Sequence, residues 1–319
     1  MMRIRFWGTR GSLPVSLTAA MVRAKLVAAL RGASGRTFAS DGELDEYIDG
    51  LGMPVAGTYG GHTSCVEFET GSGEYVLCDL GSGARPFAQQ AIARHGPASP
   101  QTYHLFMSHV HWDHIMGFPF FVPAYIPGNR IRIYGGHPGL EAALRRQHGA
   151  PSFPVDFAAL AATIEFVHLE PGIDHQIAGM SVRLLLQRHA GDSYGYRFTS
   201  QGRSVVYTTD SEHKLVDPAE THRFVEFFRD ADVVIFDAMY SLAETVSVKA
   251  DWGHSNNIVG VELCQLANVR QLCMFHHEPA MSDAEIARVL TKTRSYEQLT
   301  RRGEPLLVTT AYDGMEIDL

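Results

Sequence analysis

Short apolar runs recur along the chain and are separated by polar turns. Many of these runs are rich in Val, Ile, Leu and Tyr and are bounded by Gly, Asp or Pro, a pattern typical of β-strands. The pattern predicts strands over Arg3–Trp7, Ser64–Glu69, Tyr75–Leu80, Tyr103–Met107, Arg130–Tyr134, Ile164–His168, Met180–Gln187, Gly195–Thr199, Ser204–Thr208, Val233–Asp237, Gln271–Met274 and Leu306–Ala311.

Longer segments with apolar residues near helical spacing lie between some of these strands. Near the C-terminus, Ser282-Asp283-Ala284-Glu285 matches a capping box, in which the Ser and Glu side chains bond to each other's backbone N–H groups. The pattern predicts helices over Thr18–Arg31, Gly139–His148, Asp217–Arg229, Asn257–Leu266 and Ser282–Arg302.

The predicted strands come in groups and alternate with helices only in part. This order favours two packed sheets flanked by helices over a simple parallel doubly wound sheet. The chain has 319 residues, of which 45% are hydrophobic, so it can bury a large core. We predict one domain over residues 1–319, interrupted by a helical insertion at about 16–58. The insertion could be a lid over a functional site or a segment packed on the protein surface, and the sequence favours neither alternative.

Composition narrows the location and the redox setting. No run of eighteen apolar residues occurs, so no membrane span is predicted, and the first residues lack the features of a signal peptide. The four cysteines are scattered without a Cys-x-x-Cys pair, which argues against a zinc knuckle and against a disulfide scaffold. They are Cys65, Cys78, Cys264 and Cys273. A reducing cytoplasm is the predicted location.

The net charge of −8 does not favour broad nucleic-acid binding, which depends on neutralising phosphates. Arg145-Arg146 and Arg301-Arg302 could form a local basic patch, but paired arginines are more typical of a solvated helix face. We therefore expect a small-molecule or short phosphodiester substrate and no membrane partner, and a homodimer is left open.

The densest cluster of potential metal ligands is His109-Val110-His111-Trp112-Asp113-His114, which follows the predicted strand Tyr103–Met107. Imidazole nitrogens and carboxylate oxygens are ligands for zinc and similar ions. Two histidines two positions apart can converge on one ion, while Asp113 and His114 can serve a second. We therefore predict a dinuclear metal site at this strand end.

Four residues cannot complete two metal sites, so further ligands are expected at other strand ends. His189 follows Met180–Gln187, and Asp210 follows Ser204–Thr208. His276 and His277 both follow the apolar run that ends in Met274-Phe275, and either could be the ligand.

The series His109-x-His111-x-Asp113-His114, His189, Asp210, His276 resembles the ligand series of the metallo-β-lactamase superfamily. This resemblance implies an αββα sandwich. It implies that His109, His111 and His189 hold one metal, that Asp113, His114 and His276 hold the other, and that Asp210 bridges them. Asp79, in Asp79-Leu80-Gly81, is similar to the Asp-x-Gly motif of the family and is expected to orient ligands from behind, with His277 also behind the ligands.

Other motifs indicate a branch of the superfamily. Asp210 stands where true β-lactamases often place Cys. The segments Gly8-Thr9-Arg10-Gly11-Ser12 and Gly60-Gly61-His62-Thr63-Ser64 resemble motifs of RNase Z-like phosphodiesterases, with His62 in place of Asn. Trp252-Gly253-His254-Ser255-Asn256 resembles the His-Ser-Thr motif of RNase Z, with Asn256 in place of Thr.

The resemblance implies a metal-dependent phosphodiesterase in which metal-bound hydroxide attacks phosphorus. Asp113 and His254 are the expected catalytic residues, with His254 assisting proton transfer to the leaving oxygen. RNase Z proper carries a long arm between the third motif His and the bridging Asp, but here only 21 positions separate His189 from Asp210. This spacing argues against tRNA 3′-processing.

Three alternatives stay open: a lactonase or thioesterase that acts at carbon, a tRNA 3′-processing endonuclease, and a non-catalytic sensor. The expected cofactors are two divalent ions, zinc first and manganese or iron next. Candidate substrate contacts are Arg10, Thr63, Ser64 and Arg197.

Overall fold

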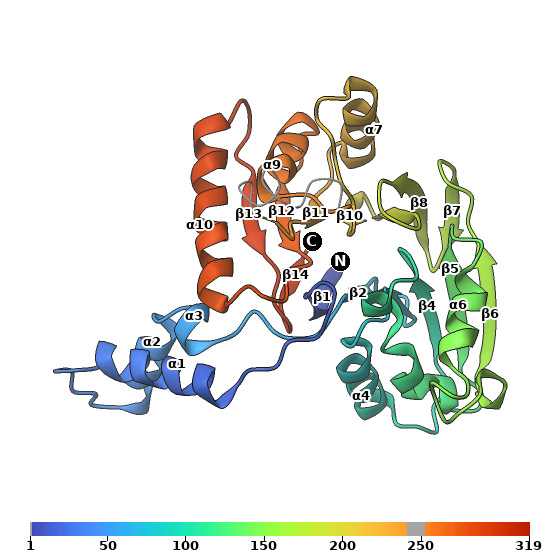
Figure 1. Cartoon of the computed structure of the whole chain (residues 1–319), viewed down its shortest axis with the longest axis horizontal. Helices are drawn as coiled ribbons and strands as arrows, with labels where there is room; N and C mark the ends of the chain where they lie inside the picture. The colour runs from blue at the N-terminus through green and yellow to red at the C-terminus, as the bar shows by residue number, and fades with distance from the viewer. Residues whose placement is uncertain (1, 241–252) are drawn as a thin grey trace.

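The computed structural model describes residues 2–240 and 253–319, and within these ranges two seven-stranded sheets pack face to face (Figure 1). The first sheet has the order β14 (Glu316–Asp318), β1 (Arg3–Gly8), β2 (Cys65–Glu69), β3 (Tyr75–Cys78), β4 (Thr102–Phe106), β5 (Arg130–Gly135) and β6 (Thr163–His168). The second has the order β13 (Leu307–Thr310), β12 (Gln271–Phe275), β11 (Val233–Asp237), β10 (Arg203–Thr208), β9 (Ser193–Ser200), β8 (Met180–Gln187) and β7 (Asp174–Ile177).

Helices cover the outer face of each sheet. α4 (Ala84–His95) and α6 (Leu140–Gln147) pack on the first sheet. α7 (Pro218–Phe228), α9 (Asn257–Leu266) and α10 (Asp283–Thr300) pack on the second. The connection from β4 to β5 contains the short helical turns α5 (Trp112–Ile115), η1 (Phe118–Phe120) and η2 (Val122–Tyr125). The connection from β5 to β6 contains η3 (Phe157–Ala159). The predicted αββα sandwich is confirmed.

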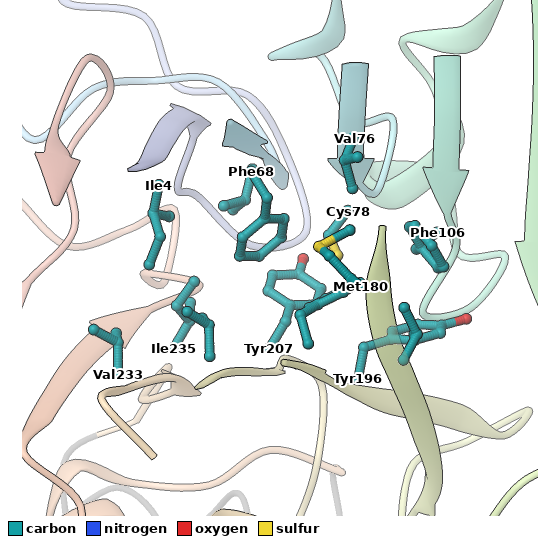
Figure 2. Packing of buried hydrophobic residues seen from close by; sticks show 14 of the residues in the cluster. Ile4, Phe68, Val76, Cys78, Phe106, Met180, Tyr196, Tyr207, Val233 and Ile235 are labelled. Atoms are coloured by element: carbon teal, nitrogen blue, oxygen red, sulfur yellow. The ribbon is translucent and has the colours of Figure 1, made fainter. Parts of the chain in front are cut away.

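Alternating residues of the strands form the layer between the sheets (Figure 2). In β1, for example, Ile4 and Phe6 are fully buried, while their neighbours Arg3 and Arg5 form ion pairs with carboxylates of β14. Such alternation is what a strand with one face on the core requires. The inner layer includes Phe68, Val76, Cys78, Phe106, Met180, Tyr196, Tyr207, Val233 and Ile235.

Each sheet is antiparallel in one half and parallel in the other. β3 to β6 run parallel in the first sheet, and β10 to β13 run parallel in the second. Ligands in such sheets bind beyond the carboxyl ends of the parallel strands. The residues that directly follow β4, β10, β11 and β12 are therefore brought together at one edge of the sandwich.

Between β1 and β2 the chain leaves the sandwich as three helices, α1 (Ala19–Gly32), α2 (Asp41–Asp49) and α3 (Met53–Ala56). In Figure 1 they form an arm that extends away from the two sheets below α10. These helices lie within the predicted insertion at 16–58, and the division of the chain into one domain with an insertion stays a prediction.

The predicted elements correspond closely to the observed ones. All twelve predicted strands and all five predicted helices are confirmed, with ends that agree within two residues. In the described part of the chain, no helix combines the length and the apolar character needed to cross a membrane.

Candidate metal centre

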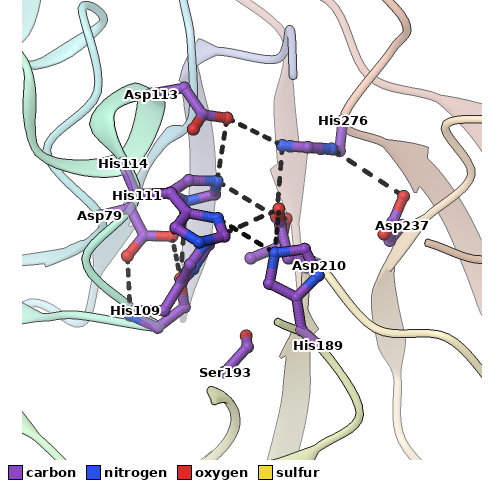
Figure 3. A network of polar contacts seen from close by, with 12 residues as sticks. Asp79, His109, His111, Asp113, His114, His189, Ser193, Asp210, Asp237 and His276 are labelled. Carbon is purple, nitrogen blue, oxygen red and sulfur yellow. Dashed lines mark hydrogen bonds and ion pairs between the residues drawn. The ribbon is translucent and has the colours of Figure 1, made fainter. Parts of the chain in front are cut away.

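The loop after β4 and the first turn of α5 supply four polar side chains to a network of polar contacts (Figure 3). His109 follows the strand, His111 is the N-cap residue of α5, and Asp113 and His114 lie within this short helix. His109, Asp113 and His114 are buried. The helical turn sends Asp113 and His114 to a different position from His109 and His111, so the cluster divides into two ligand sets.

The first ligand set consists of His109, His111, His189 and Asp210, whose potential ligand atoms all lie within 4.8 Å of one another. His111 Nδ1 lies 3.1 Å from His189 Nε2. Asp210 Oδ2 lies 3.7 Å from both His109 Nε2 and His189 Nε2. Two nitrogens bound tetrahedrally to one zinc ion stand about 3.3 Å apart, so this spacing suits a common ion.

The second ligand set consists of Asp113, His114, His276 and Asp210. Asp113 Oδ2 lies 3.2 Å from both His114 Nε2 and His276 Nε2. Asp210 Oδ1 lies 3.1 Å from His114 Nε2 and 3.2 Å from His276 Nε2. These separations suit one ion with a mixed nitrogen and oxygen donor set.

Asp210 belongs to both sets because its two carboxylate oxygens face different neighbours. Oδ2 faces the first set and Oδ1 faces the second. Asp210 adopts a left-handed backbone with φ of 45°, and His276 does so with φ of 61°. Such conformations are uncommon for residues other than glycine and cluster at functional sites, where they aim a side chain. Both residues turn sharply just past a strand and point toward the ligand sets.

The residues of the two sets fit a pair of metal ions because some of their buried imidazole nitrogens have no hydrogen-bond partner. His109 Nε2 and His114 Nε2 are buried and have no hydrogen-bond partner, although both point at carboxylate oxygens. An unpaired buried polar atom is costly unless something binds it. Burial lowers the pKa of His109 well below its ordinary value, which keeps the ring neutral as a metal ligand requires.

Asp79 lies behind the second set and fixes His114. It is fully buried, and its Oδ2 accepts hydrogen bonds of 2.7 Å from His114 Nδ1, Tyr207 Oη and Ser108 Oγ. Its Oδ1 accepts a 2.7 Å bond from the Ser108 backbone N–H. Because Nδ1 of His114 is bonded to Asp79, Nε2 is the nitrogen that faces the second ligand set.

We expect Asp79→Asn to weaken metal binding by roughly 10- to 100-fold, because the amide cannot accept all the bonds that the carboxylate receives. The measurement is competition with a chromophoric chelator. Glu67→Gln is the matched control, since Glu67 is also buried but bonds to Trp7 Nε1 on the outer side of the first sheet. Equal metal affinity in the Asp79→Asn and Glu67→Gln proteins would contradict the role given to Asp79.

His254 lies beside both ligand sets and is held by a carboxylate. Its Nδ1 donates to Asp237 Oδ2 at 2.8 Å, and its ring centre lies 5.1 Å from that of His189 and 5.3 Å from that of His276. Burial alone lowers the pKa of His254, but the Asp237 carboxylate outweighs it and raises the pKa to about 9. The Asp237 carboxylate thus favours the protonated form of the His254 ring, which lies beside both ligand sets. Trp252, the first residue of its motif, lies outside the described residues.

The structure separates the two candidate histidines after β12. His276 Nε2 points at the second ligand set, whereas His277 Nε2 donates to the Ala311 carbonyl at 2.9 Å. His62 lies apart from the ligands, with Nδ1 3.1 Å from Ser82 Oγ. Gly11, in the first glycine-containing motif, leaves room for the His276 ring, because a Cβ at this position would stand 2.5 Å from that ring.

The structure places none of the predicted substrate contacts in either ligand set. The Arg10 guanidinium is buried and donates to the carbonyls of Gly60, Glu278 and Met281. Arg197 donates to the Phe227 carbonyl and to Ser204 Oγ. Thr63 and Ser64 are fully buried, and Thr63 Oγ1 accepts from the Ser82 N–H.

Two contributors to the site were missed at the sequence level. Asp237 directly follows the apolar run of β11, which is the same signal that identified His189 and Asp210. The Ser12 backbone N–H donates to Asp113 Oδ2 at 2.8 Å. A backbone donor cannot be predicted from a pattern of side chains.

A family model described as the beta-lactamase superfamily domain matches residues 74–277, which contain every residue of both ligand sets. Among curated proteins, the ribonuclease Z of Bradyrhizobium diazoefficiens is 25% identical over 279 residues. That alignment covers 70% of this chain and 88% of the relative.

Solved structures show the same fold over the whole chain. The metallo-beta-lactamase fold protein YhfI from Bacillus subtilis superposes with a TM-score of 0.65 at 16% identity, covering 99% of this chain and 98% of that one. A diphosphatase from the PhnP family superposes with a TM-score of 0.60 at 17% identity, covering 100% of this chain and 98% of that one.

Proposed function

The chain belongs to the metallo-β-lactamase superfamily of metal-dependent hydrolases, and on this premise we propose that it hydrolyses phosphodiesters. One observation carries the proposal. The Asp210 carboxylate is shared between two ligand sets, and His254, oriented by Asp237, stands beside them. Two ions a few ångströms apart suit in-line displacement at phosphorus, and the oriented imidazole suits protonation of a leaving oxygen.

The ligand residues fit two divalent ions, and we propose zinc for them, with manganese or iron as the next candidates. His109, His111 and His189 would hold one ion, and Asp113, His114 and His276 would hold the other, with Asp210 between them. When bound, the ions supply Lewis acidity that polarises the phosphoryl oxygens. Asp113 is held in place by the Ser12 N–H, so the loop after β1 fixes one side of the site.

The protein's own proton chemistry centres on His254. Its Nδ1–H is committed to Asp237, so only Nε2 can deliver a proton to a leaving oxygen. With 11% of its side chain exposed, His254 is largely shielded from bulk water but is not fully buried. This arrangement supports a leaving group that departs as a strongly basic alkoxide, as in a nucleotide or ribonucleic acid.

The relative named ribonuclease Z favours a second candidate, tRNA 3′-processing, which is a phosphodiester cleavage by the same site. Two features of this chain limit it. The segment between His189 and Asp210 consists of the hairpin of β9 and β10, which leaves no room for a substrate-gripping arm there. The net charge is −8, and the arm that the chain does carry has an acidic helix, α2. A short phosphodiester remains our first candidate.

The test is a substrate panel on the metal-reconstituted protein: bis(p-nitrophenyl) phosphate, cyclic nucleotides, a precursor tRNA, a lactone and a thioester. We expect turnover of the small phosphodiesters that is lost on chelation and restored by zinc. Cleavage of precursor tRNA at a much higher kcat/KM would favour the second candidate. Activity confined to the lactone or the thioester would overturn the proposal.

A further inference from the structure

The helical arm, residues 19–56, and the segment leading into it carry many of the exposed large apolar side chains of the described chain. None of the residues of α1, α2 and α3 is buried. Seventeen large apolar side chains are exposed in the described ranges, and seven of these belong to the arm and the segment leading into it. They are Leu13, Leu17, Val22, Leu26, Leu30, Leu44 and Ile48.

Three of these side chains form a stripe on one face of α1. Val22, Leu26 and Leu30 follow each other at four-residue steps, which places them on a common face of a helix. They are 43%, 58% and 71% exposed, so exposure rises toward the tip of the arm. A contiguous apolar stripe of this kind is typical of a protein interface, whereas isolated exposed leucines are ordinary.

A neighbouring face of α1 contacts the body of the protein. Lys25 Nζ donates to Asp283 Oδ2 at 2.6 Å and to the carbonyls of Pro54 and Gly57 at 2.8 Å. α3 packs between α1 and α10. This anchor holds α1 by the face that carries Lys25, and the stripe of Val22, Leu26 and Leu30 stays exposed beside it.

An arm without a buried residue has little to stabilise it alone. Helices of this length are marginal in water, and most of their stability in proteins comes from packing an apolar face. Inside the arm, Tyr47 Oη donates to the Ala29 carbonyl and the Tyr47 ring lies 5.3 Å from Phe38, but the stripe takes part in neither contact. Covering the stripe would therefore stabilise the arm.

The charges of the arm indicate what covers it. α1 carries the exposed cations Arg23 and Arg31, whereas α2 carries five carboxylates within nine residues. Among the described residues no ion pair joins these two groups within one copy of the arm. A surface that holds both signs can complement itself across a two-fold axis. The acidic helix disfavours nucleic acid and anionic lipid as the occupant.

We propose that the arm is a homodimerisation element, in which the stripe of Val22, Leu26 and Leu30 packs against the arm of a second copy. A two-fold axis through this contact would place the cations of α1 opposite the carboxylates of α2 of the other copy. The inference rests on the arm alone and is independent of the proposed function.

Sedimentation velocity of the full-length protein, over a wide range of micromolar concentrations, tests the proposal. We expect a dimer for the natural chain. In the double variant Leu26→Glu with Leu30→Glu we expect the dissociation constant to rise at least roughly 100-fold, because each substitution occurs twice in a two-fold interface. Leu299→Glu is the matched control, since Leu299 is 85% exposed on α10 and should leave the dimer unchanged.

Metal content and far-ultraviolet circular dichroism show whether the double variant keeps the folded sandwich. Cross-linking gives a second measurement that does not depend on that variant. All four natural cysteines are buried, so Leu26→Cys would add an exposed thiol at the centre of the stripe. We expect a bismaleimide to link two copies through this position, but not through Leu299→Cys. A monomer at every concentration, a dimer that survives the double variant, or no cross-link at Leu26→Cys would each overturn the proposal.

Discussion

Asp210→Ala is expected to abolish hydrolysis and to deplete both metal positions. The Asp210 carboxylate gives Oδ2 to the first ligand set and Oδ1 to the second. Asp210 is the one residue that these two sets share. Because paired ions contribute several kcal/mol of transition-state stabilisation, kcat/KM for bis(p-nitrophenyl) phosphate should fall by roughly 10³-fold or more. Metal content, measured by mass spectrometry on the purified protein, should fall from two ions per chain.

Two variants show that this loss is specific. Asp318→Ala removes an exposed carboxylate of the edge strand β14, which pairs with Arg3, and should leave activity and metal content unchanged. Asp210→Asn keeps one acceptor oxygen and should hold one ligand set better than the other, so we expect it to retain more metal than Asp210→Ala. Full metal content together with ordinary activity in Asp210→Ala would refute the shared role of this carboxylate.

The closeness of the candidate ligand residues was predictable because each signal is local in the sequence. A strand that ends in a polar ligand type is visible as an apolar run followed by His or Asp, and the fold brings these ends together. His109, His189, Asp210 and His276 all follow this rule. Their role as ligands is a prediction that metal analysis has to test, while their closeness is a fact of the structure.

Other parts of the site depend on tertiary structure and left no local signal. The choice between His276 and His277 follows from the left-handed turn at His276, which sends one ring to the metal cluster and the next to the Ala311 carbonyl. Asp237 carried the same strand-end signal as Asp210, but its role depends on His254, which comes from another loop. The contact from the Ser12 N–H to Asp113 is made by the backbone.

The elements that were missed have physical explanations. β7 and β14 are short edge strands with exposed polar residues, so they lack the apolar run that marks the other strands. α4 contains Pro86, which suggests a break, yet a proline in the first turn of a helix costs no hydrogen bond. The arm was expected as an insertion, but its anchor, the contact of Lys25 with Asp283, depends on tertiary structure and left no local signal.

His254→Ala is expected to separate phosphodiester chemistry from carbonyl chemistry. If His254 protonates the leaving oxygen, its loss should lower kcat for cyclic nucleotides, whose leaving group is a basic alkoxide, by roughly 10²- to 10⁴-fold. The same change should affect bis(p-nitrophenyl) phosphate far less, because p-nitrophenolate departs without a proton. Metal content should stay the same, since His254 Nδ1 binds Asp237 and the ring belongs to neither of the two main ligand sets.

The dependence on the leaving group is what makes this test decisive. A structural role for His254 would lower kcat for both substrates by the same factor, and a carbon-centred hydrolase would lose little activity on lactones. Asp237→Asn should give a weaker form of the same pattern, because it leaves the imidazole in place but removes the carboxylate that orients it and favours its protonated form. Rates that fall equally for alkoxide and p-nitrophenolate leaving groups would assign His254 to the scaffold of the site, and the proton would then have to come from solvent.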